Sequence, residues 1–364
     1  MKNYGLDLHG EMLLGEYQSQ QHLYLKLQEV VKKELGKLVK KSGMTINTME
    51  FRIKEEASLA GKLKRKGSKY HSLQDITDIL GARIITFYNE DVDRIAALAE
   101  SLFEIDWSNS VDKRKMHEVS SFGYNSLHYI CRVPKTLYYD PELPQLNTIR
   151  FEIQMRTALQ HVWSAIQHDI GYKSEIEIPM EYHRQLSRLA GLLEVADDEF
   201  SRIRTSIVDY RRRIQKLVHK GLLEEVPIDG DSFNSYMAIR PFDKLNRKIA
   251  AITQAEIQEA PFLPYLKVIR QLKLKTLGDI GRMIKEDSDD AYQLALFQLG
   301  STDIDILSET IGLQNLCIVH NLKTGRGKPG LIKMFEAING IHPQNETLAS
   351  IVIEQASRLS FMNQ

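Results

Sequence analysis

The chain has 364 residues, with 48 Lys and Arg residues against 48 Asp and Glu residues and a hydrophobic fraction of 43%. This length predicts two or three domains, and the apolar content excludes a disordered chain. A formal net charge of zero argues against a protein that binds nucleic acid or anionic lipid through its overall field, although a local basic patch is compatible with it.

The two cysteines, Cys131 and Cys317, are too few and too far apart for a disulfide framework or a CxxC metal site, which favours a reducing compartment. The N-terminus has no unbroken apolar run of the kind that a signal peptide needs, and no window is apolar enough for a membrane span. We therefore expect a cytoplasmic protein that makes no contact with a membrane.

Hydrophobic periodicity predicts helices and strands in alternation over the first half of the chain. The expected helices cover residues 11–40, 55–66 and 92–103, and the expected strands cover residues 47–54, 82–88, 126–133 and 148–155. A long helix follows over residues 180–220. This order predicts an α+β domain over residues 1–224, with a mixed β-sheet flanked by helices.

The pattern changes after the long helix. Residues 225–233 contain Pro227, Gly230 and two aspartates, which is typical of a linker. Shorter helical patterns without a clear repeat follow over residues 236–260, 262–275, 276–286, 289–299 and 303–315. We expect residues 234–364 to form a separate, all-helical C-terminal domain, whose role the sequence does not reveal.

Polar and apolar side chains alternate in the segment Arg150–Thr157. Residues of like parity share a face of a strand, so Arg150, Glu152, Gln154 and Arg156 are expected on one side, with the apolar residues between them in the core. An exposed strand face with cross-strand ion pairs would show the same pattern.

Asp78 stands at the entry to the strand expected over residues 82–88, and Gly81 permits a close backbone approach there. A carboxylate in that place can meet Glu152 from a neighbouring strand. Two carboxylates at converging strand ends supply the oxygen ligands that Mg²⁺ prefers. Helix capping and turn formation are the other common uses of such an aspartate.

A basic cluster accompanies the helix expected over residues 55–66. Lys54, Ser58, Lys62 and Arg65 are spaced to form one stripe, which suits a triphosphate. A solvated basic face would have the same spacing.

The segment Phe122–Tyr129 combines a turn glycine with an aromatic residue. Gly123 predicts a turn, and Tyr124 and His128 share one face of the strand that follows. An aromatic ring beside such a turn is a platform for stacking a base, and ordinary packing against a strand edge is the alternative.

Together these motifs resemble the synthetase domain of RelA/SpoT-type alarmone synthetases. The resemblance rests on R-x-K-x3-S-x3-K from Arg52, D-I-L-G-A-R from Asp78, G-Y-N-S-L-H from Gly123, E-I-Q-M-R-T from Glu152, Q-H-V-W-S-A-I-Q-H from Gln160, and Tyr172-Lys173. It covers about residues 45–175. No separate metal-dependent hydrolase half is visible, so the chain is similar to the short, synthetase-only members with an added C-terminal domain.

The resemblance implies a nucleotidyltransferase-like fold and a pyrophosphokinase that moves the β,γ-pyrophosphate of ATP to the 3′-hydroxyl of GTP or GDP, giving AMP and (p)ppGpp. The residues implied for ATP are Arg52, Lys54, Ser58, Lys62, Arg65 and Arg83. The residues implied around the acceptor are Tyr124, His128, Gln154 and Arg156. Asp78 and Glu152 are implied as catalytic Mg²⁺ ligands, and proton acceptance from the 3′-hydroxyl is the alternative role of Glu152.

The segment Asp112–Phe122 departs from the family pattern, since Ser120 and Phe122 stand where most members have a Lys and an Asn. One of the basic residues 113–115 is a candidate substitute for the missing charge. Because these changes lie on the acceptor side, two alternatives stay open. One is a toxin-like pyrophosphokinase acting on the 3′ end of tRNA or on adenosine nucleotides. The other is an inactive domain that binds nucleotide and a protein partner. The sequence also leaves open whether the chain forms a homo-oligomer.

Three further signals carry less weight. The segment Gly325–Gly330 matches GxGxxG, but the surrounding chain lacks the βαβ context of a dinucleotide fold, so a flexible turn is the better interpretation. The segment Lys273–Ile280 has a faint similarity to helix-hairpin-helix sequences that contact nucleic acid, for which a plain helix start is the simpler explanation. His161 and His168 lie on one helical face without a cysteine or HExxH motif, so we expect them to pack or orient groups behind the site.

Overall fold

The structure, a computed structural model, describes residues 4–115, 126–172 and 180–363. The chain divides into an N-terminal unit, Met1–Thr205, and a C-terminal unit, Ser206–Gln364. This boundary falls inside one helix, α5 (Met180–His219), and not at the linker expected over residues 225–233. In that segment Val226 is buried in the core of the C-terminal unit and Asp229 caps the next helix, so its proline and glycine mark a helix start.

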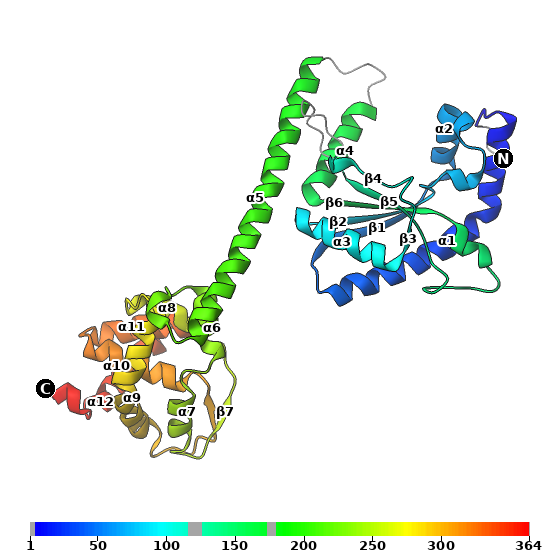
Figure 1. Cartoon of the computed structure of the whole chain (residues 1–364). Coiled ribbons are helices and arrows are strands. Elements are labelled where there is room, and N and C mark those ends of the chain that lie inside the picture. The colour runs from blue at the N-terminus through cyan, green and yellow to red at the C-terminus, as the bar shows by residue number, and fades with distance from the viewer. Residues whose placement is uncertain (1–3, 116–125, 173–179, 364) are drawn as a thin grey trace. The chain divides into compact units, whose positions relative to one another are not determined.

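A mixed six-stranded sheet forms the centre of the N-terminal unit (Figure 1). Its strands lie in the order β1 (Ile46–Ile53), β2 (Leu80–Thr86), β6 (Phe151–Thr157), β5 (Leu127–Arg132) and β3 (Glu104–Ile105), and β4 (Val111–Asp112) pairs with β5. Strands β2 and β6 are parallel, and the other neighbours are antiparallel. The predicted mixed sheet is confirmed. Strands β3 and β4 are too short to leave a periodic signal in the sequence.

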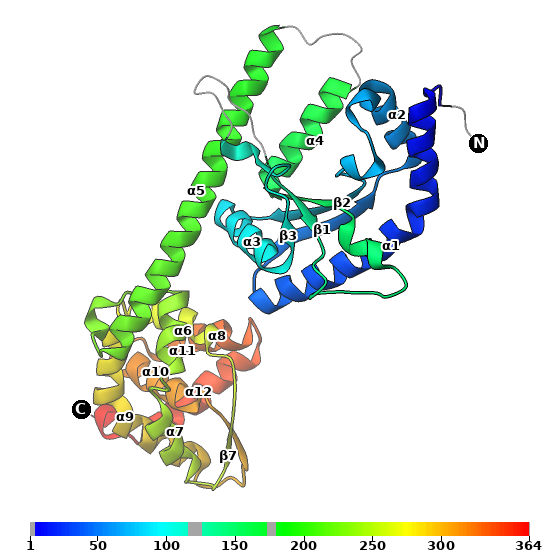
Figure 2. The same cartoon turned by 45° about the vertical axis from the view of Figure 1, so that its right-hand side comes forward.

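Helices cover both faces of the sheet. In Figures 1 and 2, α1 (Leu8–Ser42) and α3 (Asn89–Leu102) lie below it and α4 (Ala158–Tyr172) lies above it. Helix α2 (Glu56–Lys66) packs beside α1 and shares its core. Alternate residues of β2 and β6, among them Ala82, Ile84, Ile153 and Met155, are buried in one core with apolar residues of α1 and α3. Since the period of a strand is two, the opposite face of β2 and β6 carries the polar side chains.

Polar contacts attach the first part of α5 to this unit. Thr157, at the end of β6, donates a hydrogen bond to Asp197 at 2.5 Å. Arg204 donates to the buried carboxylate of Asp91 at 2.5 Å, and its guanidinium lies 4.3 Å from the ring centroid of Tyr88. The carboxyl end of β6 is therefore braced from outside the sheet.

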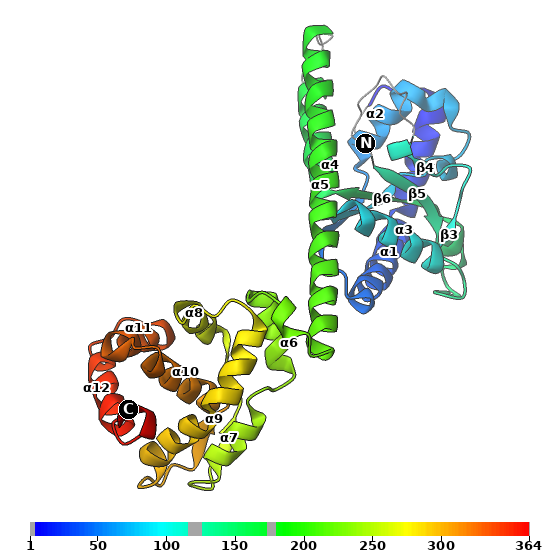
Figure 3. The same ribbon diagram turned by 60° about the vertical axis from the view of Figure 1, so that its left-hand side comes forward.

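Helices form most of the C-terminal unit (Figure 3). They are the last part of α5, followed by α6 (Gly230–Ala238), α7 (Asp243–Ala250), α8 (Leu263–Gln271), α9 (Leu277–Leu299), α10 (Ile311–Lys323), α11 (Gly327–Asn339) and α12 (Gln344–Ala356). The predicted helical character of this region is confirmed, with the addition of one parallel pair of short strands, β7 (Glu256–Gln258) and β8 (Ile306–Ser308). None of the described helices is both long and apolar enough to cross a membrane.

Several helix boundaries in this unit differ from the expected ones. The helix expected over residues 236–260 is broken after α6, where Arg240 has a φ of 51° and precedes Pro241. The helices expected over residues 276–286 and 289–299 are one helix, α9. The helix expected from residue 303 begins only at Ile311, because residues 306–308 pair with β7. Such long-range pairing leaves no trace in local periodicity.

Candidate active site

Two rows of residues cross the polar face of the sheet. The register of the strands places Arg52, Gly81 and Glu152 in the first row, and Glu50, Arg83, Gln154 and His128 in the second. Gly81 has no side chain, and a Cβ built on it would meet only the carbonyl oxygen of Arg52, at 3.9 Å. The glycine therefore leaves open space between Arg52 and Glu152.

A pocket of about 380 Å³ lies over these rows. It is lined by Glu50, Phe51, Arg52, Asp78, Gly81, Ala82, Arg83, Glu152 and Gln154. Five residues that were predicted as site residues thus share one pocket of the size that small ligands occupy. Glu50 was not predicted as a site residue, although its parity with Arg52 along β1 is a signal that could have found it.

Asp78 lies between two lysines. Its Oδ2 accepts a hydrogen bond from Lys54 Nζ and its Oδ1 accepts one from Lys62 Nζ, each at 2.7 Å. Burial by itself would raise the pKa of Asp78, but these two charged donors outweigh it and hold the pKa below its usual range. Burial would lower the pKa of Lys62, which the contact with Asp78 raises instead. The site thus contains an ionised carboxylate between two ammonium groups.

Glu152 is held by two neighbours on the polar face. Its Oε1 lies 2.7 Å from His128 Nδ1, and its Oε2 accepts a hydrogen bond from Gln154 Nε2 at 2.8 Å. Burial would raise the pKa of Glu152, as would the charge of Asp78, but the contacts with His128 and Gln154 lower it. Asp78 and Glu152 are therefore both ionised at neutral pH.

A chain of hydrogen bonds continues from Gln154 to Arg156, which donates to its Oε1 at 2.5 Å. Burial, together with the positive charge of Arg83, lowers the pKa of Arg156 to about 10. The Nε atoms of Arg83 and Arg156 and the Nδ1 atom of His161 are buried without a hydrogen-bond partner in the described part of the chain. Buried polar groups are normally paired, so this set favours a ligand that brings acceptor groups.

Not every predicted residue joins this arrangement. Ser58 and Arg65 lie on α2 with exposed side chains, and neither is bonded to Asp78 within the described ranges. Lys54 lies between β1 and α2, so the expected stripe is built from a strand end and a helix. Tyr124 lies outside the described residues, as do Ser120 and Phe122.

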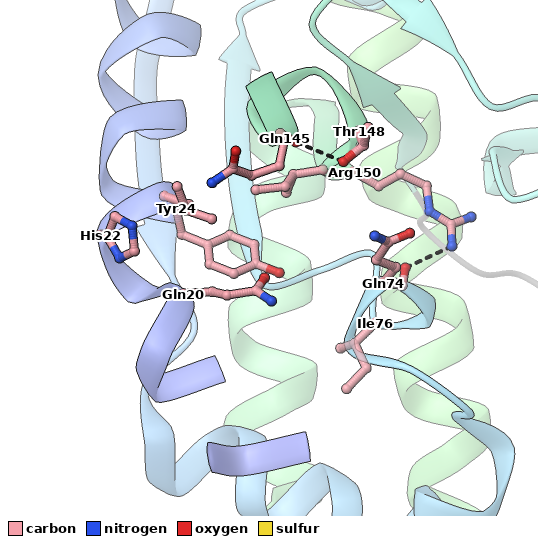
Figure 4. A pocket seen from close by; sticks show the side chains of 10 residues that line it. Gln20, His22, Tyr24, Gln74, Ile76, Gln145, Thr148 and Arg150 are labelled. Atoms are coloured by element: carbon pink, nitrogen blue, oxygen red, sulfur yellow. Dashed lines mark hydrogen bonds between the residues drawn. The ribbon is translucent and has the colours of Figure 1, made fainter. Parts of the chain in front are cut away.

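Arg150 departs from the face that Glu152, Gln154 and Arg156 share. It precedes β6 and donates hydrogen bonds to Asp106 Oδ2 at 2.9 Å and to the carbonyl oxygen of Gln74 at 2.7 Å. Figure 4 shows Arg150 beside a separate pocket of about 260 Å³, into which α1 contributes Tyr24. The predicted polar face therefore keeps three of its four members, because β6 begins only after Arg150.

Glu50 pairs with Arg83, so Asp78 and Glu152 are the carboxylates of the pocket that could hold a metal. The described residues contain no group of three or more His, Cys, Asp or Glu side chains placed to bind one. Two ionised carboxylates in one pocket fit a Mg²⁺ ion, which usually takes only one or two protein carboxylates and completes its octahedron with phosphate oxygens and water.

Sequence comparison places this site in a known family. The model described as "Region found in RelA / SpoT proteins" matches residues 51–177. GTP pyrophosphokinase YjbM of Bacillus subtilis (strain 168) is 31% identical over 157 residues, which make up 43% of this chain and 71% of that protein. The chain belongs to the RelA/SpoT family. The predicted family resemblance is confirmed, and the matched residues include every pocket residue except Glu50.

The chain is also similar to a second curated relative and to solved structures. GTP pyrophosphokinase YwaC of Bacillus subtilis (strain 168) is 26% identical over 168 residues, which are 44% of this chain and 75% of that protein. Among solved structures, small alarmone synthetase 1 from Bacillus subtilis has 22% identity and a TM-score of 0.44, over 54% of this chain and 99% of that chain. A GTP pyrophosphokinase family protein from Streptococcus pneumoniae has 24% identity and a TM-score of 0.45, over 54% of this chain and 96% of that chain.

Proposed function

We propose that the protein is a GTP pyrophosphokinase, which transfers the β,γ-pyrophosphate of ATP to the 3′-hydroxyl of GTP or GDP. One observation carries the proposal: a single pocket combines two ionised carboxylates, Asp78 and Glu152, with the guanidinium groups of Arg52 and Arg83. The names of the two relatives, both GTP pyrophosphokinases, support the same activity.

The donor nucleotide is assigned to the residues around Asp78. An ammonium group has three donors, and Asp78 accepts from Lys54 and from Lys62, so each lysine keeps donors for the phosphates of ATP. Ser58 and Arg65 extend this phosphate site along α2. Arg52 and Arg83, from neighbouring strands, are assigned to the two sides of the adenine, because a planar guanidinium stacks on aromatic rings.

The acceptor is assigned to the residues around Glu152. In the proposed step the 3′-oxygen forms a bond to the β-phosphorus of ATP. The bond from that phosphorus to the oxygen shared with the α-phosphorus breaks, and AMP leaves with this oxygen. Glu152, being ionised, accepts the proton of the 3′-hydroxyl, and His128 and Gln154 fix its orientation. Arg156 contributes positive charge, and Tyr124 is assigned to the acceptor base.

Mg²⁺ is the proposed cofactor, with Asp78 and Glu152 as its protein ligands. When bound, it neutralises negative charge on the transferred phosphoryl groups. The two roles of Glu152 can be separated by raising the Mg²⁺ concentration in assays of Glu152→Gln. If Glu152 is mainly a ligand, high Mg²⁺ restores part of the rate. If it is mainly the proton acceptor, the rate stays low at every concentration.

The decisive experiment is product analysis. The full chain is incubated with ATP, Mg²⁺ and either GTP or GDP, and the products are identified by mass spectrometry. AMP and a guanosine nucleotide with a 3′-pyrophosphate are expected. Glu152→Gln and Asp78→Asn should lower the rate by about 10²–10³-fold or more, the usual loss when a group that stabilises the transition state is removed. No such product from wild type with either acceptor would sink the proposal.

A second candidate keeps the chemistry and changes the acceptor. Ser120 and Phe122 replace the Lys and Asn of the family pattern, which favours a toxin-like enzyme that modifies the 3′ end of tRNA or an adenosine nucleotide. Incubation with γ-labelled ATP and tRNA tests it, since label on the tRNA supports this candidate. The third hypothesis is an inactive protein that binds nucleotide. It requires nucleotide binding without turnover in wild type. The ionised carboxylates of Asp78 and Glu152 argue against it.

A further inference from the structure

A second pocket of interest lies in the C-terminal unit. It measures about 580 Å³ and is formed by the end of α8, the residues that follow it, α10 and the first turns of α11. Helices α8 and α11 are in contact, and Figure 3 shows them on the same side of this unit. We call it the C-terminal pocket and define it by Val268, Lys273, Asn321, Arg326, Gly330 and Lys333.

The charges of the C-terminal pocket are all positive. Lys273, Arg326 and Lys333 line it, and no carboxylate does so among the described residues. Arg326 donates hydrogen bonds to the carbonyl oxygens of Gln271 and Leu272 at the end of α8, so its role is to fix that wall. Lys273 and Lys333 have exposed side chains and form no ion pair within the described ranges. The two lysines therefore supply charge that no described carboxylate neutralises.

The floor of the C-terminal pocket contains a buried amide. Asn321 is 2% exposed, and its Oδ1 has no hydrogen-bond partner in the described part of the chain. A Cβ built on Gly330, another lining residue, would come within 2.6 Å of both amide atoms of Asn321, so only glycine leaves room for this side chain. Since buried polar groups are normally hydrogen-bonded, the unpartnered amide oxygen points to a bound molecule.

The GxGxxG motif, Gly325–Gly330, forms the turn that enters α11. Gly325 and Gly327 have φ values of 72° and 53°, which favour glycine, and α11 begins without a side-chain cap. The first turn of this 13-residue helix offers the pocket no free N–H group, because Pro329 has none and the N–H of Gly330 donates to the carbonyl oxygen of Arg326. The expectation that this motif is a turn outside a βαβ unit is correct, and any positive charge that the pocket offers an anion therefore comes from its side chains.

We propose that the C-terminal pocket binds a small phosphorylated molecule, with its phosphates against Lys273 and Lys333 and its remainder over Asn321. The volume of about 580 Å³ is far larger than inorganic phosphate and suits a ligand of nucleotide size. A nucleic-acid backbone would need a basic track along the surface, whereas these groups surround a hollow with a buried amide at its floor. This inference does not depend on the function proposed for the N-terminal unit.

Hydrogen–deuterium exchange of the full chain, read by mass spectrometry, tests the proposal. The probes are ATP, inorganic pyrophosphate and a single-stranded oligoribonucleotide, each at matched ionic strength. ATP or pyrophosphate should slow exchange in peptides covering residues 268–275 and 321–334. The double variant Lys273→Gln/Lys333→Gln should need at least tenfold more probe for the same protection. The control Lys244→Gln/Lys285→Gln removes two exposed lysines of the same unit and should behave as wild type.

Three results would overturn the proposal. The first is that neither ATP nor pyrophosphate protects these peptides from exchange. The second is that the control variant loses as much protection as the double variant. The third is that only the oligoribonucleotide protects them. Asn321→Asp is a second variant, which places a negative charge at the floor and should abolish protection while the fold is retained. Peptides covering residues 50–83 report on the proposed active site in the same experiment, so failure there is distinguishable from failure here.

Discussion

The Nδ1 atom of His128 lies 2.7 Å from the Oε1 atom of Glu152, across the antiparallel strands β5 and β6. Ser126 contacts the other ring nitrogen, Nε2, at 2.7 Å. A carboxylate can only accept, so Nδ1 must carry the proton that joins the pair. The imidazole is thereby held at both nitrogens, and it holds one oxygen of Glu152 while Gln154 holds the other. His128 therefore acts on the chemistry through the position and ionisation of Glu152.

The variant His128→Leu tests this relationship through the pH profile. The contact with His128 lowers the pKa of Glu152, so its removal leaves only the hydrogen bond from Gln154 to oppose burial, and the pKa rises. As the pH is lowered, Glu152 then becomes protonated, and unable to accept a proton, at a higher pH than in wild type. We expect the acid limb of the plot of kcat/KM against pH to move to higher pH. His183→Leu, on an exposed position of α5, should leave the limb in place. An unchanged limb in His128→Leu would contradict the coupling.

The variant Asp78→Asn tests the pair of lysines. Removing the charge leaves Lys54 and Lys62 together without their common counterion, at side-chain exposures of only 11% and 23%. We expect a loss of unfolding free energy of about 1–3 kcal/mol, less than for a fully buried pair because water still reaches the site. Urea unfolding followed by tryptophan fluorescence measures it, since both Trp107 and Trp163 lie in the N-terminal unit.

Asp75→Asn is the matched control for activity. Asp75 accepts hydrogen bonds from the backbone of His71 and Ser72 at a nearby turn and does not line the pocket. It should lose some stability but keep the rate of AMP formation, whereas Asp78→Asn loses both. Equal rates in the two variants would contradict the assignment of Asp78.

Most of the N-terminal fold could be predicted because its elements carry strong local patterns. The apolar residues of α1 recur at helical spacing, and β6 alternates between buried and polar side chains. The boundary between the two units could not be predicted, because it falls within the unbroken helical pattern of α5. The pair β7 and β8 was missed for a different reason, since its partners are joined by a contact between residues far apart in sequence.

The site was predictable in its members and less so in its contacts. Strand parity brought Glu152, Gln154 and Arg156 to one face, as the hydrogen bonds between them confirm. The pairing of Asp78 with two lysines arises because Lys54 directly follows the end of β1 while Lys62 lies on α2. Helical spacing alone does not reveal this pairing. Glu50 was missed because an isolated acidic residue in a strand has no motif. Its importance comes from the register that places it opposite Arg83.

Variants of Arg83 test the contact proposed for adenine. Arg83 reaches Glu50 at 3.0 Å through Nη1 and lines the pocket, while its Nε has no partner among the described residues. If its planar group stacks on the base, Arg83→Ala should raise the KM for ATP by about tenfold or more, and Arg83→Lys should do little better. Arg94→Ala, on an exposed part of α3, is the control. Full recovery in Arg83→Lys would show that only the charge matters.

Asp106 provides a test of stability against pH. It accepts hydrogen bonds from Ser108, Asn109 and Arg150, and although burial would raise the pKa of Asp106, these donors lower it to about 2. Because the folded pKa is below the ordinary value of 3.8, the stabilisation is present above that pH and is lost as the pH falls toward 2. Asp106→Asn should lower the free energy of unfolding by about 1–2 kcal/mol at pH 7, and the difference should shrink by pH 3.

The same tryptophan signal measures this effect at pH 3, 5 and 7. Glu29→Gln is the control, because Glu29 is 73% exposed and its ion pair with Lys26 is long, at 3.5 Å. Exposed pairs of this kind contribute little, so the control should differ from wild type by less than about 1 kcal/mol at every pH. A difference for Asp106→Asn that is the same at pH 3 and pH 7 would contradict the role of its ionised form.

The variant Gly81→Val separates the pocket from the fold. A Cβ at Gly81 meets only the Arg52 carbonyl oxygen, at an ordinary contact distance of 3.9 Å, and valine favours strands. The N-terminal unit should therefore unfold at the same urea concentration as wild type, or at a higher one. The valine methyl groups enter the space between Arg52 and Glu152, so the KM for ATP should rise by at least about tenfold, with a smaller rise in Gly81→Ala. A stable Gly81→Val protein with wild-type kinetics would show that substrate does not use this part of the pocket.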